Sequence, residues 1–264
     1  NRECFRVVFD DGTSIVADAA HPWQIEERGR RNKTGVEWTT KSMTTAELVP
    51  GTHFVWATKP LNLPDADVPI DPYVLGVWLS DGDSAEPRIT QANRDADALR
   101  VALEQAGALV GCNNRHAAGT SAARFTVNGI RSKLVRAGLL NNKHIPAVYL
   151  RGSLAQRLAL LQGLMDGDGS IATNGSRVCQ FSTGSEAIRD GVAELLRTVG
   201  IKAKWRTRMP RVSSMLDGRQ VVGRRPVFQF EFTAPPPEAM PMFRLPRKFA
   251  SQKARNGVYH PRRR

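Results

Sequence analysis

Two short segments of the chain share a pattern that could bind a metal ion. Gly76 and Asp81 recur as Gly163 and Asp168, and a glycine follows each aspartate, so both copies read G-x-x-x-x-D-G. Each copy lies in or behind an apolar run, VLGVWL in the first and LALLQGLM in the second. Hard divalent cations prefer oxygen ligands such as carboxylates. The duplication therefore predicts a metal site built from one aspartate of each copy.

The apolar runs predict two buried helices that pack against each other, because both are apolar almost all round. Each helix ends at its aspartate, where the glycine that follows is suited to stopping it. Gly76 and Gly163 are small enough for the two backbones to approach closely, which brings Asp81 and Asp168 side by side. The negative ends of both helix dipoles lie there too, so two carboxylates are poorly tolerated unless a cation joins them.

The motifs have two other interpretations. A pair of core helices with ordinary Asp-Gly caps stays possible. A calcium loop that starts at Asp166 is excluded, because its twelfth position is Arg177 rather than a bidentate glutamate. Asp83 and Asp166, the additional acids near the motifs, are expected to be solvated.

The repeated motif resembles that of the LAGLIDADG homing endonucleases, in the form that carries two copies in one chain. The resemblance extends over roughly residues 70–250, a span close to one ordinary domain or two small halves. It implies an α+β fold in which two pseudo-symmetric αββαββα half-domains pack through their motif helices. It also implies that Asp81 and Asp168, together with Gly82 and Gly169, form the site for Mg²⁺.

The segments around the motifs alternate between strand and helix patterns, as that fold requires. Period-two alternation and amphipathic spacing predict the elements that follow. Strands are expected at 87–92, 121–129, 177–183 and 225–234, and helices at 95–107 and 185–200. The sequence thus favours two mixed half-domains, each presenting a sheet to one side of a DNA duplex.

The charge distribution favours a nucleic-acid partner. The 264 residues carry a formal net charge of +13, and residues 200–264 hold 16 Lys and Arg against 3 Asp and Glu. Within IKAKWRTRMP the basic residues occupy every second position, so a strand would direct them to one side. The residues in question are Lys202, Lys204, Arg206 and Arg208, and the same basic face is expected to include Arg211, Arg219, Arg224 and Arg225. A solvated sheet face is the alternative.

Other groove contacts are expected from the strand at 87–92. Arg88 and Gln91 are of the types that make bidentate contacts with guanine and adenine. The preferred partner is therefore double-stranded DNA with a long target site, bound by a monomer.

Lysines next to the motifs are candidates for catalysis. Lys143, in NNKHIPAVYL, precedes Ile-Pro upstream of the second motif, and the resemblance implies that it positions the attacking water or stabilises charge on the phosphate. Lys248, in RLPRKFASQK, is the candidate for the matching lysine of the other half, and Lys204 and Lys253 compete with it. An exposed lysine ahead of a helix is the alternative for Lys143.

The first 60 residues form a different, β-rich unit with a hairpin signal at Asp11-Gly12. The stretch DGTSIVADAAHPW resembles part of the splicing domain (Hint fold) of inteins, in which His21 would activate the N-terminal scissile peptide. Asp18 replaces the usual threonine, and Trp23 follows, a combination similar to inteins of replicative DNA helicases with a Trp-Cys-Thr set. A core histidine is the alternative for His21. LAGLIDADG nucleases are often inserted in inteins, so the two resemblances support each other.

Together these features predict a fragment of an intein, lacking both splice junctions, with a host protein in cis. The expected division is 1–60 for part of the splicing domain, 61–150 and 151–250 for the half-domains, and 251–264 for a basic tail. The predicted activity is metal-dependent hydrolysis of both DNA strands at a specific site. A DNA-binding regulator that does not cut, and an RNA-splicing maturase, remain alternatives. Three scattered cysteines, no apolar run of membrane-spanning length and no signal peptide fit a cytoplasmic protein.

Overall fold

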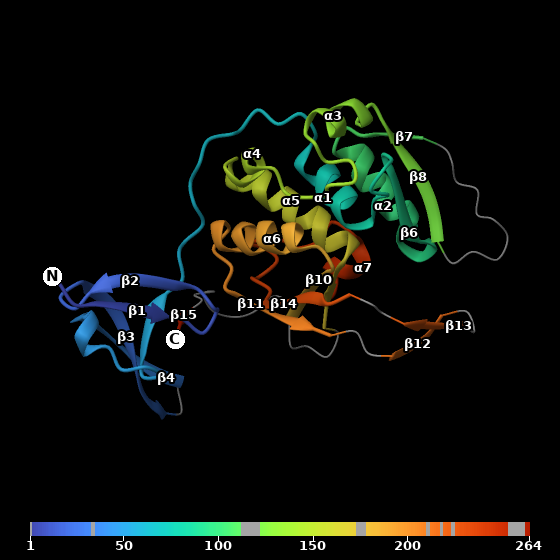
Figure 1. Cartoon of the computed structure of the whole chain (residues 1–264). Coiled ribbons are helices and arrows are strands. Elements are labelled where there is room, and N and C mark those ends of the chain that lie inside the picture. Colours follow the sequence, from blue (N-terminus) through green and yellow to red (C-terminus); the bar gives the residue numbers. More distant parts are fainter. Residues whose placement is uncertain are drawn as a thin grey trace.

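The computed structural model describes residues 2–32, 35–111, 122–172, 178–209, 212–216, 219–222, 225–252 and 262–264. A β-rich unit lies at one end of the molecule and the helices that carry the motifs lie at the centre of the rest (Figure 1). None of the described helices is long and apolar enough to cross a membrane.

The N-terminal unit contains a hairpin and a four-stranded sheet. The hairpin joins β1 (Cys4–Val8) to β2 (Ser14–Asp18), and the sheet has the order β15-β5-β3-β4. Its strands are β3 (Pro22–Asn32), β4 (Gly35–Thr44), β5 (His53–Trp56) and β15 (Arg262–Arg263), and a 3-10 helix (Thr45–Glu47) follows β4. The unit has a small core of its own, made by Phe9, Ala17, Trp23 and Ile25. Because β15 pairs with β5, the basic tail returns to this unit.

The motif helices, α1 (Pro72–Asp81) and α5 (Leu154–Gly167), pack side by side as expected (Figure 1). A Cβ atom added to Gly76 would lie 2.3 Å from the carbonyl oxygen of Leu160, and one added to Gly163 would lie 2.3 Å from that of Tyr73. Since real Cβ atoms do not approach a carbonyl oxygen so closely, only glycine permits this spacing. The predicted close approach of the two backbones is therefore confirmed.

Each motif helix opens one half-domain, and the two halves repeat the same order of elements. The first half continues with β6 (Arg88–Ala92), α2 (Asn93–Gln105), β7 (Leu109–Gly111), β8 (Ala122–Asn128) and α3 (Arg131–Arg136). The second half follows α4 (Ala147–Leu150) and α5 with β9 (Gly169–Ile171), β10 (Val178–Thr183), α6 (Glu186–Thr198), β11 (Ala203–Arg208), β14 (Val227–Thr233) and α7 (Pro246–Phe249). A hairpin of β12 (Val212–Leu216) and β13 (Arg219–Val222) lies between β11 and β14.

The sheets of the two halves correspond strand by strand. Their orders are β6-β8-β7 and β9-β10-β14-β11. In the second half Gly169 of β9 pairs with Phe181, and in the first half an isolated bridge between Gly82 and Ile89 takes the same place. The second half therefore has the expected αββαββα order, and in the first half the first strand is reduced to that bridge. One continuous apolar core joins both halves through α1 and α5.

The glycines after the two aspartates have a different role from the one predicted. Gly82 has φ −79°, and neither it nor Gly169 is among the described residues with positive φ, so no left-handed cap ends either helix. Glycine is required at these two positions because there is no room for a side chain. A Cβ atom at Gly82 would lie 2.3 Å from the carbonyl oxygen of Trp78, and one at Gly169 would lie 2.5 Å from that of Met165.

Replacing Gly76 by alanine should destabilise the protein strongly. The new methyl group meets backbone atoms, which cannot move aside as a flexible side chain would, so we expect a loss of about 3 kcal/mol in the free energy of unfolding. Urea unfolding of Gly76→Ala measures it. Gly184→Ala is the matched control, because nothing lies within 4 Å of its added Cβ. Equal stabilities of the two variants would contradict the close helix contact.

Candidate catalytic centre

Asp81 and Asp168 lie at the adjoining C-terminal ends of α1 and α5. Asp81 is the last residue of α1, and Asp168 caps α5. A Cβ atom added to Gly167 would lie 3.2 Å from the Oδ2 atom of Asp81, so the end of α5 packs directly against this carboxylate. Electrostatic repulsion from Asp168 also raises the pKa of Asp81. The structure thus brings the two predicted carboxylates together.

Two lysines hold the ends of the motif helices in the same way. The Nζ atom of Lys143 donates to the carbonyl oxygens of Trp78, Leu79 and Gly82, at 2.8, 3.2 and 2.6 Å. The Nζ atom of Lys248 contacts the second copy at the carbonyl oxygens of Met165, Asp166, Gly167 and Gly169, at 3.0, 2.6, 3.1 and 2.7 Å. Met165 and Gly169 are the counterparts of Trp78 and Gly82 in the repeat.

Lys248 is therefore the structural counterpart of Lys143. Of its two competitors, Lys204 lies on an exposed strand and contacts Asp10, and Lys253 lies outside the described residues. Lys143 is not an exposed lysine ahead of a helix, because its ammonium group is held at the end of α1. Each lysine places a positive charge where the helix dipole is negative, which stabilises both ends.

Burial sets the ionisation of the centre. Loss of hydration, followed by repulsion from Asp168, raises the pKa of Asp81 to about 7, although Lys248 and Lys143 act in the opposite direction. Loss of hydration also raises the pKa of Asp168. Burial lowers the pKa of Lys143 to about 8 and that of Lys248 below its ordinary value. Because the pKa values of both carboxyl groups are raised, a bound cation would stabilise their charged forms.

The donor set fits a magnesium ion. Among the described residues no group of three or more His, Cys, Asp or Glu side chains could hold a metal ion. Mg²⁺ does not need such a cage, because it binds one or two carboxylates and takes its other ligands from water and substrate phosphates. The carbonyl oxygens of Gly82 and Gly169, expected to be metal ligands, each accept a hydrogen bond from a lysine, so they lie beside the carboxylates but already have a cationic partner.

Gln91 takes part in this centre rather than in the exposed face of its strand. Its side chain is only 9% exposed, and its Nε2 atom donates to Oδ2 of Asp81 at 3.1 Å. The predicted groove contact is corrected, because Gln91 alternates with Thr90 and so shares the inner face of β6 with Ile89. The hydrogen bond to Asp81 favours the ionised carboxylate.

The two extra acids near the motifs differ from each other. Asp166 is fully buried and accepts hydrogen bonds from the Tyr73 hydroxyl and from the backbone nitrogens of Arg244 and Leu245. The expectation that it is solvated was wrong, because its side chain lies on the inner side of α5. Asp83 is exposed, and its carboxylate lies 3.6 Å from a guanidinium nitrogen of Arg88.

The basic strand β11 directs three of its residues away from the core. Lys204, Arg206 and Arg208 pair with Glu231, Gln229 and Val227 of β14, whereas Phe228, Phe230 and Phe232 face the helices. Directly opposite residues in antiparallel strands share a face. Lys204, Arg206 and Arg208 are exposed, as the alternation predicted.

Lys202 does not belong to this face, contrary to the expectation. It precedes β11, its side chain is only 18% exposed, and its Nζ atom lies 2.7 Å from Oδ1 of Asp10 in the N-terminal hairpin. It also donates to the carbonyl oxygen of Arg262, so it joins the two units rather than facing solvent. The side chains of Arg211, Arg219 and Arg224 lie outside the described residues.

A row of polar side chains crosses this sheet face, and sequence reasoning missed it. Gln229 donates to Gln180, Gln180 donates to Glu231, and Arg206 donates to the same glutamate, at 3.1, 3.1 and 2.8 Å. The Oε1 atom of Gln229 is buried without a partner among the described residues. Period-two alternation in RPVFQFEFTA was the signal that could have identified Gln229 and Glu231.

The corresponding face of the first half carries Arg88, Thr90 and Arg124, since Thr90 pairs with Arg124 and Arg88 with Thr126. Arg124 is exposed and was not predicted.

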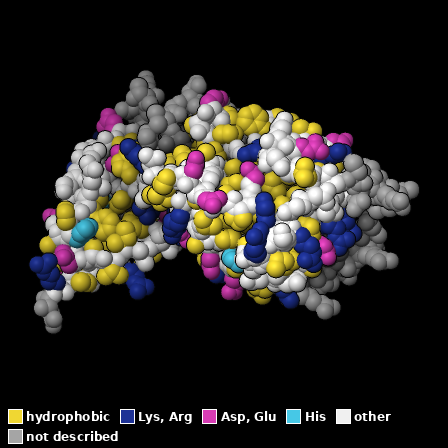
Figure 2. Space-filling view, turned by 90° about the horizontal axis from the view of Figure 1, so that it is seen from above, with side chains coloured by type: hydrophobic (Ala, Val, Ile, Leu, Met, Phe, Trp, Pro, Cys, Tyr) yellow, Lys and Arg dark blue, Asp and Glu magenta, His cyan; other side chains and the backbone are white. Residues whose placement is uncertain are grey.

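Figure 2 shows the molecule from above, where Asp and Glu side chains are interspersed with Lys and Arg.

The residues expected to act in splicing lie together in the N-terminal unit. His21 is exposed, which argues against a core histidine, and its ring centre lies 5.3 Å from that of Trp23. The buried indole of Trp23 donates to the hydroxyl of Thr45, and Asp18 accepts from the backbone nitrogen of Ala20. The roles of His21, Trp23 and Asp18 stay a prediction.

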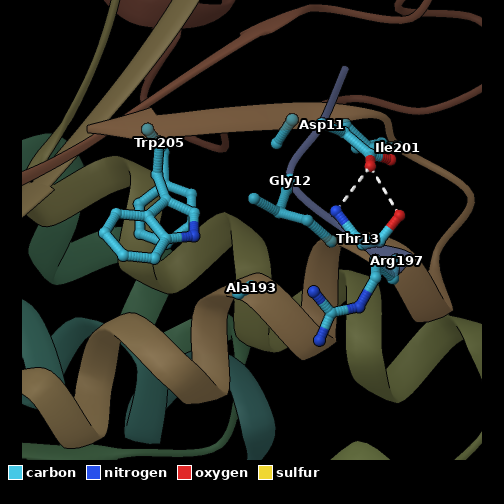
Figure 3. Close-up of a pocket in the computed structure, with 10 residues that line it drawn as sticks. Asp11, Gly12, Thr13, Ala193, Arg197, Ile201 and Trp205 are labelled. Carbon is cyan, nitrogen blue, oxygen red and sulfur yellow. Dashed lines mark hydrogen bonds between the residues drawn. The ribbon is translucent and has the colours of Figure 1, made fainter. Parts of the chain in front are cut away.

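The N-terminal hairpin also lines a small cavity of about 60 Å³ against α6 and β11. Figure 3 shows Asp11, Gly12 and Thr13 facing Arg197, Ile201 and Trp205, with the Asp11 carboxylate bonded to the backbone and hydroxyl of Thr13. The cavity is far too small for a drug-sized ligand. It marks where the hairpin packs on the second half-domain.

Comparisons with known proteins identify a similar domain family and a similar protein. Residues 155–230 match the model of the LAGLIDADG-like domain family. Over 231 residues the chain is 34% identical to the replicative DNA helicase DnaB of Mycobacterium intracellulare, a match that covers 80% of this chain and 36% of the relative. The chain thus spans about a third of the length of that curated relative.

Solved structures of the homing endonuclease I-DmoI are also similar. Its mesophilic variants match with 11% identity and a TM-score of 0.36, over 62% of this chain and 87% of theirs. I-DmoI in complex with DNA and Mn matches with the same identity and TM-score, over 62% of this chain and 88% of that one.

Residues 155–230 thus match a LAGLIDADG-like domain. The expected resemblance to the intein-embedded LAGLIDADG homing endonucleases is confirmed, and the LAGLIDADG-like domain begins in the second motif helix.

The raised pKa of Asp81 predicts how stability depends on pH. Its value of about 7 in the folded protein exceeds the ordinary value of 3.8. Between these two pH values the folded state therefore keeps a proton that the unfolded state has lost. Unfolding is then accompanied by proton release, and this group's contribution to stability falls as pH rises from about 4 to about 7 and levels off above. Asp81→Asn should therefore stabilise the metal-free protein more at pH 8 than at pH 5.

Urea unfolding at both pH values tests this. Asp190→Asn is the control, because Arg189 lowers the pKa of that exposed carboxyl group. If Asp190→Asn raised the free energy of unfolding at pH 8 as much as Asp81→Asn does, the raised pKa would not belong to Asp81.

Proposed function

We propose that the chain is a site-specific DNA endonuclease that uses Mg²⁺ to hydrolyse one phosphodiester bond in each strand of a duplex. The observation that carries the proposal is the pair of carboxylates, Asp81 and Asp168, at the ends of two helices that touch through glycine. Each carboxylate has a lysine beside it, in matching positions of the two halves. A twofold centre suits a twofold substrate, since the two strands of DNA are themselves related by a local twofold axis.

Asp81 and Asp168 would hold the metal, and the carbonyl groups of Gly82 and Gly169 would lie at the edge of the site. When bound there, a divalent ion polarises the scissile phosphate and lowers the pKa of bound water. Gln91 orients the Asp81 carboxylate through its hydrogen bond. No described residue equivalent to Gln91 bonds to Asp168, so the two sides of the centre differ in this respect.

Lys143 and Lys248 contribute charge rather than protons. The three hydrogens of the Lys143 ammonium group are matched by three carbonyl oxygens, which leaves none for the attacking water in this arrangement. The positive charge still lies close to the carboxylates and, with DNA bound, to the scissile phosphates, where negative charge develops. Of the two roles that the resemblance implies for Lys143, this arrangement favours stabilisation of charge on the phosphate over positioning of the attacking water.

The outer faces of the two sheets would bind the DNA. In the second half Lys204, Arg206 and Arg208 are exposed on one face, and the partly buried Gln180 and the buried Gln229 lie on the same face. Arginine contacts phosphates and guanine, and glutamine amides pair with adenine. Arg88 and Arg124 of the first half supply the corresponding contacts.

A DNA-binding regulator that does not cut and an RNA-splicing maturase remain alternatives with the same scaffold. Both motif carboxylates are present, which favours an enzyme over the regulator. The assignment of residues 1–60 to part of a splicing domain rests on the position of His21 beside Trp23, and it remains a prediction, as do the other domain limits.

Cleavage of a plasmid library with randomised inserts in MgCl₂ tests the proposed activity. The wild-type chain should linearise a subset of plasmids, and Asp81→Asn or Asp168→Asn should abolish cleavage while affinity for the selected DNA without metal stays about the same. Removing a carboxylate weakens metal binding without changing the basic sheet faces. Asp190→Asn, on the outer side of α6, is the control. Full cleavage by either motif variant would overturn the centre, and binding without any cleavage by the wild type would favour the regulator.

The sheet face makes a separate prediction about affinity. Replacing Arg206 and Arg208 by alanine should weaken DNA binding and reduce the slope of log affinity against log salt by about one for each phosphate that the variant no longer binds. Arg151→Ala is a matched control, because Arg151 is equally exposed and also paired with a glutamate, but lies at the start of the second half away from β11. An unchanged slope in the double variant would make β11 a solvated face only.

A further inference from the structure

The second motif contains a buried acid that the first motif lacks. Asp166 lies two residues before Asp168, and the residue in its place in the first copy is Leu79. Both side chains are buried, at 0% and 4% exposure. A buried carboxylate needs hydrogen-bond donors, so the donors that contact Asp166 show which part of the structure it stabilises.

The partners of Asp166 lie at the start of α7. The carboxylate accepts from the backbone nitrogen of Arg244 at 2.9 Å and from that of Leu245 at 3.2 Å. Leu245 is the N-cap of α7, and its own side chain makes no cap hydrogen bond. Asp166 therefore holds the backbone of the N-cap residue and of the residue before it, from a different part of the chain.

The same face of α5 also forms hydrogen bonds with the residues that precede α7. Gln162 lies one helical turn before Asp166, donates to the carbonyl oxygen of Pro241 at 2.8 Å and accepts from Nε of Arg244 at 3.0 Å. The hydroxyl group of Tyr73, in α1, also donates a hydrogen bond to the Asp166 carboxylate, at 2.8 Å. The segment that leads into α7 is thus fixed to both motif helices.

Lys248 is the third residue of α7, only three residues after Leu245. Its ammonium group returns to the end of α5, where it bonds to the carbonyl oxygen of Asp166 itself and to that of Gly169. A closed loop results, in which α5 positions α7 through the Asp166 carboxylate and α7 returns a cation to the end of α5. The first copy reaches the same lysine geometry with Leu79 in place of the acid.

We propose that Asp166 is a positioning residue that sets Lys248 at the second side of the catalytic centre and has no such effect on Lys143. This inference rests on the proposed nuclease function. Because each half supplies one lysine, the loss of Asp166 should affect the two DNA strands unequally. A general loss of core stability would affect both strands alike.

Strand-specific cleavage is the first test. On a duplex that the wild type cuts, with both strands end-labelled, Lys248→Met identifies the strand that depends on this lysine. Asp166→Asn should slow the same strand by roughly tenfold to a hundredfold, because a small misplacement of a catalytic group has effects of that size, and leave the other strand nearly unchanged. Nicked plasmid should accumulate. The double variant Asp166→Asn with Lys248→Met should be no slower than Lys248→Met alone, since both changes remove one interaction.

Hydrogen exchange of the whole chain, without metal or DNA, is the second test. Asp166→Asn should raise exchange in residues 243–250, which contain α7, and leave residues 139–146 around Lys143 as in the wild type. Asp166→Leu, which copies the first motif, should give a larger change in the same segment. Tyr73→Phe is the control, because it removes one donor but keeps both backbone contacts.

Equal slowing of both strands, faster exchange in both segments, or no change in either measurement would overturn the positioning role. If the wild type cuts no DNA, the proposed function fails, and the exchange measurement alone then decides whether Asp166 anchors α7.

Discussion

The contact between Gly76 and Gly163 is the constraint on which the rest of the structure depends. It lets α1 and α5 touch through their backbones, so the two helices end side by side and their final carboxylates meet. Each half-domain is built outward from its helix, with its sheet and second helix packed on one continuous core. A larger residue at this contact would separate the halves and with them the two aspartates. The same pair of glycines therefore sets the packing of the two halves and the positions of the two aspartates.

That arrangement concentrates negative charge and then compensates for it. Two helix dipoles, two carboxylates and a row of terminal carbonyl groups meet there. Loss of hydration, followed by repulsion from Asp168, raises the pKa of Asp81 to about 7. Lys143 and Lys248 neutralise part of the charge by binding the carbonyl oxygens. The remaining charge on the carboxylates is what a divalent cation would satisfy, so the electrostatics of the folded protein and the proposed chemistry have one origin.

The sequence predicted the parts of this centre that repeat or alternate. The duplicated G-x-x-x-x-D-G pattern identified both helices, their glycine contact and both aspartates, and alternation identified the strands with Arg206 and Arg208. Contacts between distant segments could not be predicted in this way. Gln91 turned out to face Asp81, Lys202 to bind Asp10, and Asp166 to bind the backbone at the start of α7, because each depends on how three-dimensional packing orients one side chain. The spatial need for glycine after each aspartate was likewise invisible in local sequence, which favoured a conformational explanation.

Binding of Mn²⁺ to the chain with its selected DNA, followed at pH 8 by the loss of the free-ion EPR signal, tests most directly whether Asp81 and Asp168 form one shared metal centre. If the two carboxylates share the ion, the wild type binds it, either Asp81→Asn or Asp168→Asn weakens binding, and Asp190→Asn does not. Binding that is indifferent to both motif substitutions, or that depends on only one of the two aspartates, would contradict a shared centre.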